Sequence, residues 1–134
     1  MSVAVAHQVR QTSRAAIREA AREAGFRDTD LAVIHVAESI DQDVTEAYRA
    51  GISDEIERAL GSAGLGNLKW TLHLAAGGSD VAQTILRLTE KTEAELLVIG
   101  GRRRTPVGKA LMGSATQKII LGARVPVLVM MPDD

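Results

Sequence analysis

The chain has 134 residues, of which 46% are hydrophobic, and a formal net charge of −1. These values predict a single domain over residues 1–134 with a buried core. The near-neutral charge and the 2% of aromatic residues argue against a nucleic-acid partner. The sequence has no cysteine, which excludes disulfides and thiolate metal sites. Because no apolar run reaches the length of a membrane span and no signal-peptide pattern is visible, we expect a cytoplasmic protein without a membrane partner.

Short apolar runs alternate with helical periodicity along the chain. Strands are expected at residues 3–6, 31–37, 68–75, 96–99 and 126–130, and helices at residues 13–24, 43–60, 79–91 and 114–121. Gly25 should end the first helix, Gly51 weakens the second, Ser79 should cap the third, and Ser114 with Gln117 forms a capping box for the fourth. Continuously apolar strands separated by helices predict an α/β fold, a five-stranded parallel sheet with helices on both faces.

Charge is unevenly distributed along the chain. Residues 1–95 carry ten Lys/Arg and fifteen Asp/Glu, whereas residues 96–132 carry six basic residues and no acidic one. The basic segment also contains five glycines, and its glycine-rich stretch begins at Gly100, where the fourth strand is expected to end. Ligands of parallel sheets bind at the carboxyl ends of the strands. Glycine allows close backbone approach and arginine binds phosphate, so we predict a phosphate-binding site here. A solvated basic loop is the alternative.

Other chemistries are not supported by the sequence. The P-loop pattern fails because Arg103 and Ala110 stand where it needs Gly and Ser/Thr, and no glycine follows the first strand as a dinucleotide fingerprint requires. No two histidines have metal-ligand spacing, and His7 and His35 are interpreted as structural residues. No catalytic set of residues can be assembled. We therefore expect no metal and no enzyme activity beyond very slow ATP hydrolysis.

The arrangement resembles the universal stress protein family across essentially the whole chain. The family signature is Gly-x2-Gly-x9-Gly-[Ser/Thr] after the fourth strand. The corresponding positions here are Gly100, Arg103, Gly113 and Ser114, followed by a helix and a closing strand. The resemblance implies a doubly wound sheet of order 3-2-1-4-5 and a homodimer through the C-terminal strand, from Val125 to Met131. Many members of the family bind ATP or AMP, and others bind no nucleotide.

The resemblance also implies a set of nucleotide-binding positions. Gly100 matches the first motif glycine, which lets the backbone approach the phosphates or ribose. Gly113 and Ser114, with the adjacent Ala115, match the pair that holds phosphate. Val36, at the end of the second strand, matches the position whose backbone reads the adenine.

This sequence departs from the family pattern at two of these positions. The family has an aspartate just after the first strand, where this chain has Ala6, His7 and then Gln8, and glutamine is a poor Mg²⁺ ligand. The second motif glycine is Arg103, which together with Arg102 can offer charge-assisted contacts to a phosphate. The departures leave two functions open. The first is a stress-response protein that binds an adenine nucleotide, and the second is a nucleotide-free dimeric adaptor that acts through protein contacts; an enzyme of the related adenylating folds is a more distant third.

Overall fold

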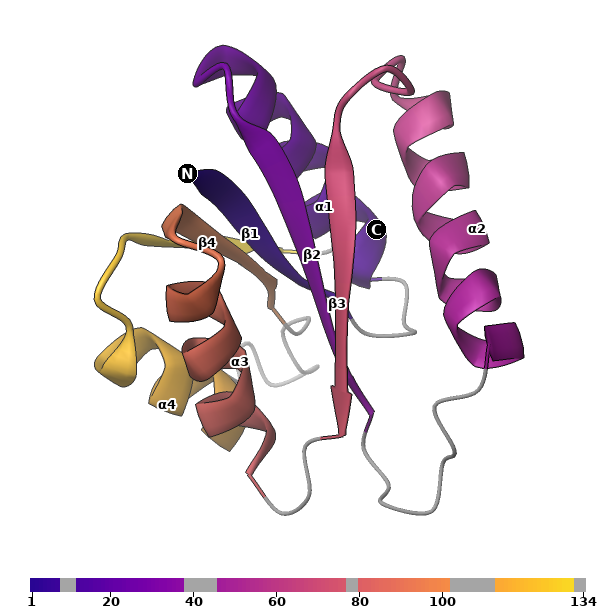
Figure 1. Cartoon of the computed structure of the whole chain (residues 1–134). Coiled ribbons are helices and arrows are strands. Elements are labelled where there is room, and N and C mark those ends of the chain that lie inside the picture. The colour runs from indigo at the N-terminus through magenta and orange to yellow at the C-terminus, as the bar shows by residue number, and fades with distance from the viewer. Residues whose placement is uncertain (8–11, 38–45, 77–79, 102–112, 132–134) are drawn as a thin grey trace, which may run out of the picture.

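The computed structural model describes residues 1–7, 12–37, 46–76, 80–101 and 113–131. Strands and helices alternate along the chain (Figure 1). The elements are β1 (Ser2–His7), α1 (Thr12–Phe26), β2 (Asp30–Ala37), α2 (Glu46–Ser62), β3 (Trp70–Ala76), α3 (Val81–Lys91), β4 (Ala94–Gly100), α4 (Ser114–Gly122) and β5 (Val127–Met130). The five strands form one parallel sheet in the order β3-β2-β1-β4-β5, which confirms the expected fold class and strand order.

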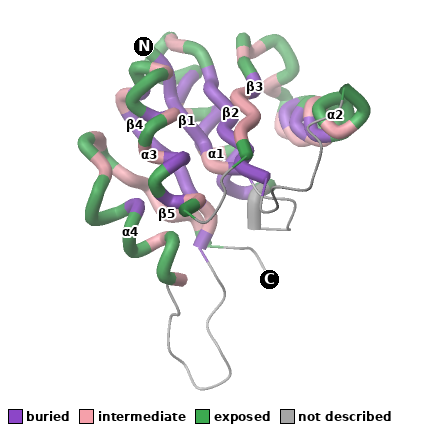
Figure 2. The backbone as a smooth tube through the Cα atoms, turned by 60° about the horizontal axis from the view of Figure 1, so that its bottom comes forward, coloured by how far each residue is buried: buried purple, intermediate pink, exposed green. Residues whose placement is uncertain are grey.

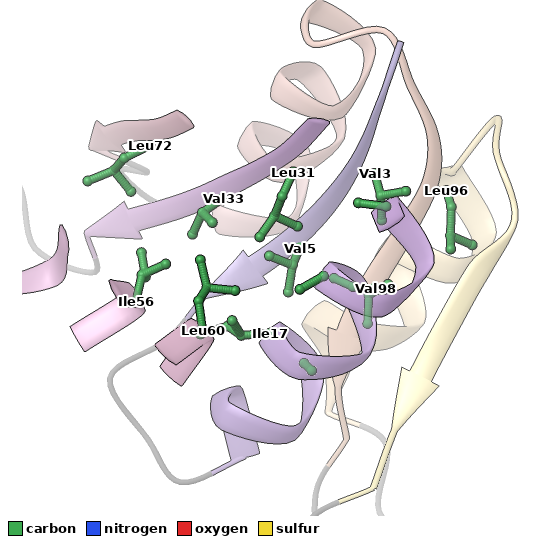
Figure 3. Close-up of a cluster of buried hydrophobic side chains, with 14 of the residues drawn as sticks. Val3, Val5, Ile17, Leu31, Val33, Ile56, Leu60, Leu72, Leu96 and Val98 are labelled. Atoms are coloured by element: carbon green, nitrogen blue, oxygen red, sulfur yellow. The ribbon is translucent and has the colours of Figure 1, made fainter. Parts of the chain in front are cut away.

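Alternation of side chains along the strands divides the core into two layers. On one face, Val3 and Val5 of β1 pack with α1 and α2, around Ile56 and Leu60 (Figure 3). On the other face, Ala4 packs with α3 and α4. Figure 2 shows buried residues concentrated on the central strands and exposed residues on the outer sides of the helices. The central strands are covered on both sides, which explains why their sequences are apolar without alternation.

The edge strand β3 has one of its outward carbonyls occupied. Arg49 of α2 donates a hydrogen bond from Nη2 to the backbone oxygen of Leu72, at 3.1 Å. On its inner side β3 pairs with β2, and the oxygen of Lys69 accepts a hydrogen bond from Leu31. The alternation of backbone groups along a strand places the oxygen of Leu72 on the side away from β2. An arginine thus covers part of this sheet edge.

The structure corrects the expected end of the first helix. α1 continues through Gly25 and ends at Phe26, because the backbone N–H of Arg27 still bonds to the oxygen of Glu23 at 3.0 Å. The chain leaves the helix at Asp28, whose φ of 54° lies in the left-handed region that aspartate tolerates. Gly51 does not interrupt α2, which is helical from Glu46 to Ser62. Ile52 and Ile56, one turn apart after the glycine, are buried in the core.

Two expected helix caps are also wrong. α3 is capped by Asp80, whose Oδ1 accepts a hydrogen bond from the backbone N–H of Gln83 at 3.0 Å, and Ser79 lies outside the described residues. In α4, Ser114 is the first helical residue and Gly113 is the N-cap, with no side-chain hydrogen bond. The Ser-x-x-Gln pattern therefore stands one position too late to form a capping box. No helix in the described ranges is long and apolar enough to cross a membrane.

Replacing Asp80 with alanine should lower the free energy of unfolding by about 0.5–2 kcal/mol, since an N–H at the start of α3 would lose its acceptor. Asp80→Asn keeps an oxygen acceptor and should remain close to the parent. Urea unfolding followed by circular dichroism measures both. Equal losses in the two variants would show that charge, not the capping hydrogen bond, is the stabilising contribution.

Candidate functional site

Four of the predicted site residues meet at the carboxyl edge of the sheet. Ala6 and His7 end β1, Val36 lies one residue before the end of β2, and Gly100 ends β4. β1 lies between β2 and β4, and all three strands run in the same direction. In Figure 1 the arrowhead of β3 marks this edge at the bottom of the sheet, where α3 also begins. The fold therefore brings these four residues together, as ligand sites of doubly wound sheets require.

The second half of the family motif lies at the start of α4. Gly113 is the N-cap in an extended conformation, and Ser114 and Ala115 follow as exposed residues of the first turn. Gly113 has no side chain to cap the helix, and within the described residues no side chain accepts from its first backbone N–H groups. Such N–H groups favour an anion. Gln8, Arg102 and Arg103 lie outside the described residues.

Gly101 has a packing role that sequence reasoning missed. Its N–H donates to the oxygen of Met130 at 2.7 Å and so extends the pairing of β4 with β5. A Cβ atom built at this position would lie 2.7 Å from Sδ of Met131 and 3.1 Å from Cγ1 of Val129. A residue with a side chain here would have to push aside the end of β5. The double glycine at the end of β4 was the available signal, because the family pattern accounts for Gly100 and leaves Gly101 unexplained.

The side chain of His7 is buried at the carboxyl end of β1. It is 1% exposed, and its Nδ1 lies 3.0 Å from Nδ1 of His35, which is 4% exposed. Nε2 of His35 contacts the hydroxyl of Tyr48 at 2.8 Å, and Nε2 of His7 lies 3.5 Å from Oε1 of Glu55. A contact from His7 to a ligand would therefore come from its backbone. Sequence reasoning treated the two histidines separately, whereas the parallel register of β1 and β2 places them side by side.

Burial lowers the pKa of His7 from its usual value of 6.5, and the carboxylate of Glu55 offsets part of this effect. The pKa of His73 is also lowered, first by burial and then by the positive charges of Lys91 and Arg49. Within the described parts of the chain, no three His, Asp or Glu side chains are grouped to hold a metal ion.

A polar groove of about 570 Å³ runs between α1 and α2 beside the histidine pair. It is lined by Arg14, Gly51, Asp54, Glu55, Arg58, Ala59 and Ser62. Glu55 thus has the solvent of the groove on one side and the buried Nε2 of His7 on the other.

The parallel sheet of order β3-β2-β1-β4-β5 defines the class of fold, a doubly wound α/β domain, and in such folds ligands commonly bind at the carboxyl edge of the sheet. A sequence model of the universal stress protein family matches residues 1–130. A universal stress protein of Mycolicibacterium smegmatis is 32% identical over 130 residues, which are 97% of each chain. The chain therefore belongs to the universal stress protein family.

Two solved structures share the fold. The universal stress protein of Archaeoglobus fulgidus in complex with dAMP is 21% identical, with a TM-score of 0.69 over 96% of each chain. A universal stress protein in complex with cAMP is 18% identical, with a TM-score of 0.72 over 99% of this chain and 98% of the other.

Proposed function

We propose that this chain is a cytoplasmic stress-response protein that binds an adenine nucleotide, ATP or AMP, at the carboxyl edge of its sheet. The observation that carries the proposal is the uncapped N-terminus of α4 in the motif position, in a chain where Ala6, Val36 and Gly100 meet at the same edge. The complexes of two structural neighbours with dAMP and cAMP support the choice of an adenine nucleotide.

The residues at the edge suit the separate parts of a nucleotide. Val36 would meet the adenine through its backbone, since its side chain is buried at 7% exposure. Gly100 would allow the ribose or phosphates to approach, and the N–H groups that follow Gly113 would hold a phosphate. No described side chain at this edge is placed as a general base, and we propose that the protein stores or senses the nucleotide, with at most very slow hydrolysis.

The basic segment after β4 predicts how affinity depends on charge. ATP should bind more tightly than AMP, and AMP more tightly than adenosine, and added salt should weaken binding. Arg103→Ala should cost about 1.5–3 kcal/mol of binding free energy, the range of a hydrogen bond to a charged group. Titration calorimetry at two salt concentrations measures each value. Adenosine that binds as tightly as ATP without a salt effect would contradict a phosphate site.

Arg103→Gly separates two ways of holding the phosphate. This variant restores the family glycine, so it should bind better than the parent if backbone approach dominates. If the arginine side chain dominates, it should bind about as weakly as Arg103→Ala, and this is the outcome we expect. The acid-free segment from Leu96 to Pro132 gathers four basic residues between Arg102 and Lys109, and in a solvated loop such like charges would only repel.

We further propose a homodimer through β5 and its flanks, from Val125 to Met131. The four residues of β5 are only half buried, Met131 is 45% exposed, and the strand is at an edge of the sheet. An apolar edge strand is commonly covered by another copy. The same surface supports the second candidate function, a nucleotide-free adaptor that acts through protein contacts. Nucleotide that co-purifies and is released by acid would favour the first function, and its absence from both the parent and Arg103→Gly would favour the second.

A further inference from the structure

The histidine pair lies where α2 meets the sheet. His7 comes from the end of β1, His35 from β2, and Tyr48 and Glu55 from α2, two turns apart. The four side chains form one line of contacts, from the hydroxyl of Tyr48 through His35 and His7 to the carboxylate of Glu55. The side chains of this line lie apart from the proposed nucleotide site, to which His7 would offer only its backbone. Alternation along β1 and β2 puts both rings on the same face as Val5 and Val33, the face covered by α1 and α2.

The neutral pair can be assigned from these contacts. Two facing Nδ1 atoms at 3.0 Å need one proton between them. If His7 donated it, the lone pair of its Nε2 would face the carboxylate of Glu55, which is repulsive. If His35 donates it, Nε2–H of His7 faces that carboxylate and Nε2 of His35 accepts from Tyr48. The second arrangement makes both hydrogen bonds of the line and turns Nε2–H of His7 toward Oε1 of Glu55, which at 3.5 Å is a charge contact and not a hydrogen bond. It is the tautomer pair that the geometry favours.

A first added proton leaves the hydrogen bond between the two Nδ1 atoms in place. It can enter at Nε2 of His35, where the hydroxyl of Tyr48 turns from donor to acceptor. It can equally be carried by His7, because the proton between the two Nδ1 atoms can move to either ring. The resulting positive charge lies next to the carboxylate of Glu55.

A second added proton cannot be accommodated in this way. Both Nδ1 atoms would then carry hydrogen, and two donors of two positive rings would face each other at 3.0 Å. The hydrogen bond would be lost and replaced by repulsion between buried like charges. The rings would separate, and Tyr48 and Glu55 would lose the polar contacts that add to the apolar packing of α2 on the sheet.

We propose that His7 and His35 form a single proton-binding site that holds α2 against the sheet and releases it when a second proton binds. Among the described residues, Tyr48 and Glu55 of α2 are the titratable groups that contact the pair, and α1 presents Arg14 across the groove. β3 contributes the apolar Leu74 opposite His35, while its His73 alternates to the other face. Burial lowers the pKa of His7, and the positive charge of the first proton disfavours a second one next to it, so the docking of α2 weakens as pH falls.

Histidine side-chain NMR on the full chain tests the proposal, since only three histidines must be assigned. Between about pH 8 and pH 4.5, His7 and His35 should move together in a first step, and a second step should follow more than about one pH unit lower. His73, which makes no contact with the pair, should titrate in one step. Hydrogen exchange of the α2 amides should accelerate across the second step. Independent single-step titrations of His7 and His35, or α2 protection that does not change with pH, would overturn the proposal.

Two matched pairs of variants separate this device from ordinary packing. His35→Phe should abolish the acid-dependent loss of α2 protection, whereas His73→Phe should retain it. Glu55→Gln removes the counter-charge and should lower the apparent pKa of the first step. Asp54→Asn, on the same helix and in the same groove, should leave that step nearly unchanged. The second pair leaves both rings in place, so it tests the counter-charge of the pair even where His35→Phe does not fold, and hydrogen exchange of the α2 amides in the parent tests the release itself. Equal shifts in Glu55→Gln and Asp54→Asn would refute a specific partner for the pair.

Discussion

Replacing Leu60 with alanine should lower the free energy of unfolding by about 2–5 kcal/mol. Leu60 is 1% exposed and lies in the layer between α2 and the sheet, close to Val33 and Val5 in the core cluster (Figure 3). The truncation removes buried apolar surface and leaves a cavity between α2 and the sheet. Denaturant unfolding followed by circular dichroism measures the loss.

Leu121→Ala is the matched control for this experiment. Leu121 is the same residue type in a helix, but it is 87% exposed, so its truncation should change the free energy of unfolding by no more than about 0.5 kcal/mol. A similar loss in the two variants would show that helix propensity, not core packing, sets the effect. A large loss from Leu121→Ala alone would place that residue in a contact with another copy.

Val129→Pro should convert the proposed dimer to a monomer of 14.3 kDa. The oxygens of Pro126 and Met130 accept hydrogen bonds from Leu97 and Gly101, so residues 126, 128 and 130 face β4. By alternation, the backbone groups of Val127 and Val129 point to the open edge. Proline at position 129 therefore removes an outward N–H and spares the pairing with β4. Light scattering over a range of protein concentrations measures the mass.

Val129→Ala controls for the side chain, because it shortens the residue and keeps the N–H. We expect it to remain dimeric with somewhat lower stability. A Val129→Pro variant that stays folded and dimeric would show that β5 is not the pairing strand. A parent that is monomeric at all concentrations would exclude the dimer itself.

The fold was predictable because its signals are local and repeated. Five short apolar runs separated by helical periodicity leave few topologies, and the family resemblance fixed the strand order. Helix ends were less predictable. Ser79 and Asp80 are adjacent and both are good capping residues, so the sequence alone could not choose between them. Gly25 is typical of a helix end, but α1 continues through it to Phe26, and the chain turns at Asp28.

The candidate site was predictable where it depends on strand ends, as at Val36 and Gly100. The roles of individual side chains were not, because they depend on contacts between distant segments. His7 and His35 are 28 residues apart, and their contact depends on the parallel register of β1 with β2. The residues of each strand alone do not indicate this register, so the sequence could not predict that the two histidines are in contact.

The hydrogen bond from Arg49 to Leu72 makes the two rims of the sheet unequal. A sheet with two open rims can add copies at both and grow into a filament. Here the β3 rim is partly occupied by a guanidinium from the same chain, which leaves the β5 rim for strand addition. In a dimer joined through β5, both outer edges of the combined sheet would be β3 strands partly covered by Arg49. Assembly through strand edges would then stop at the dimer.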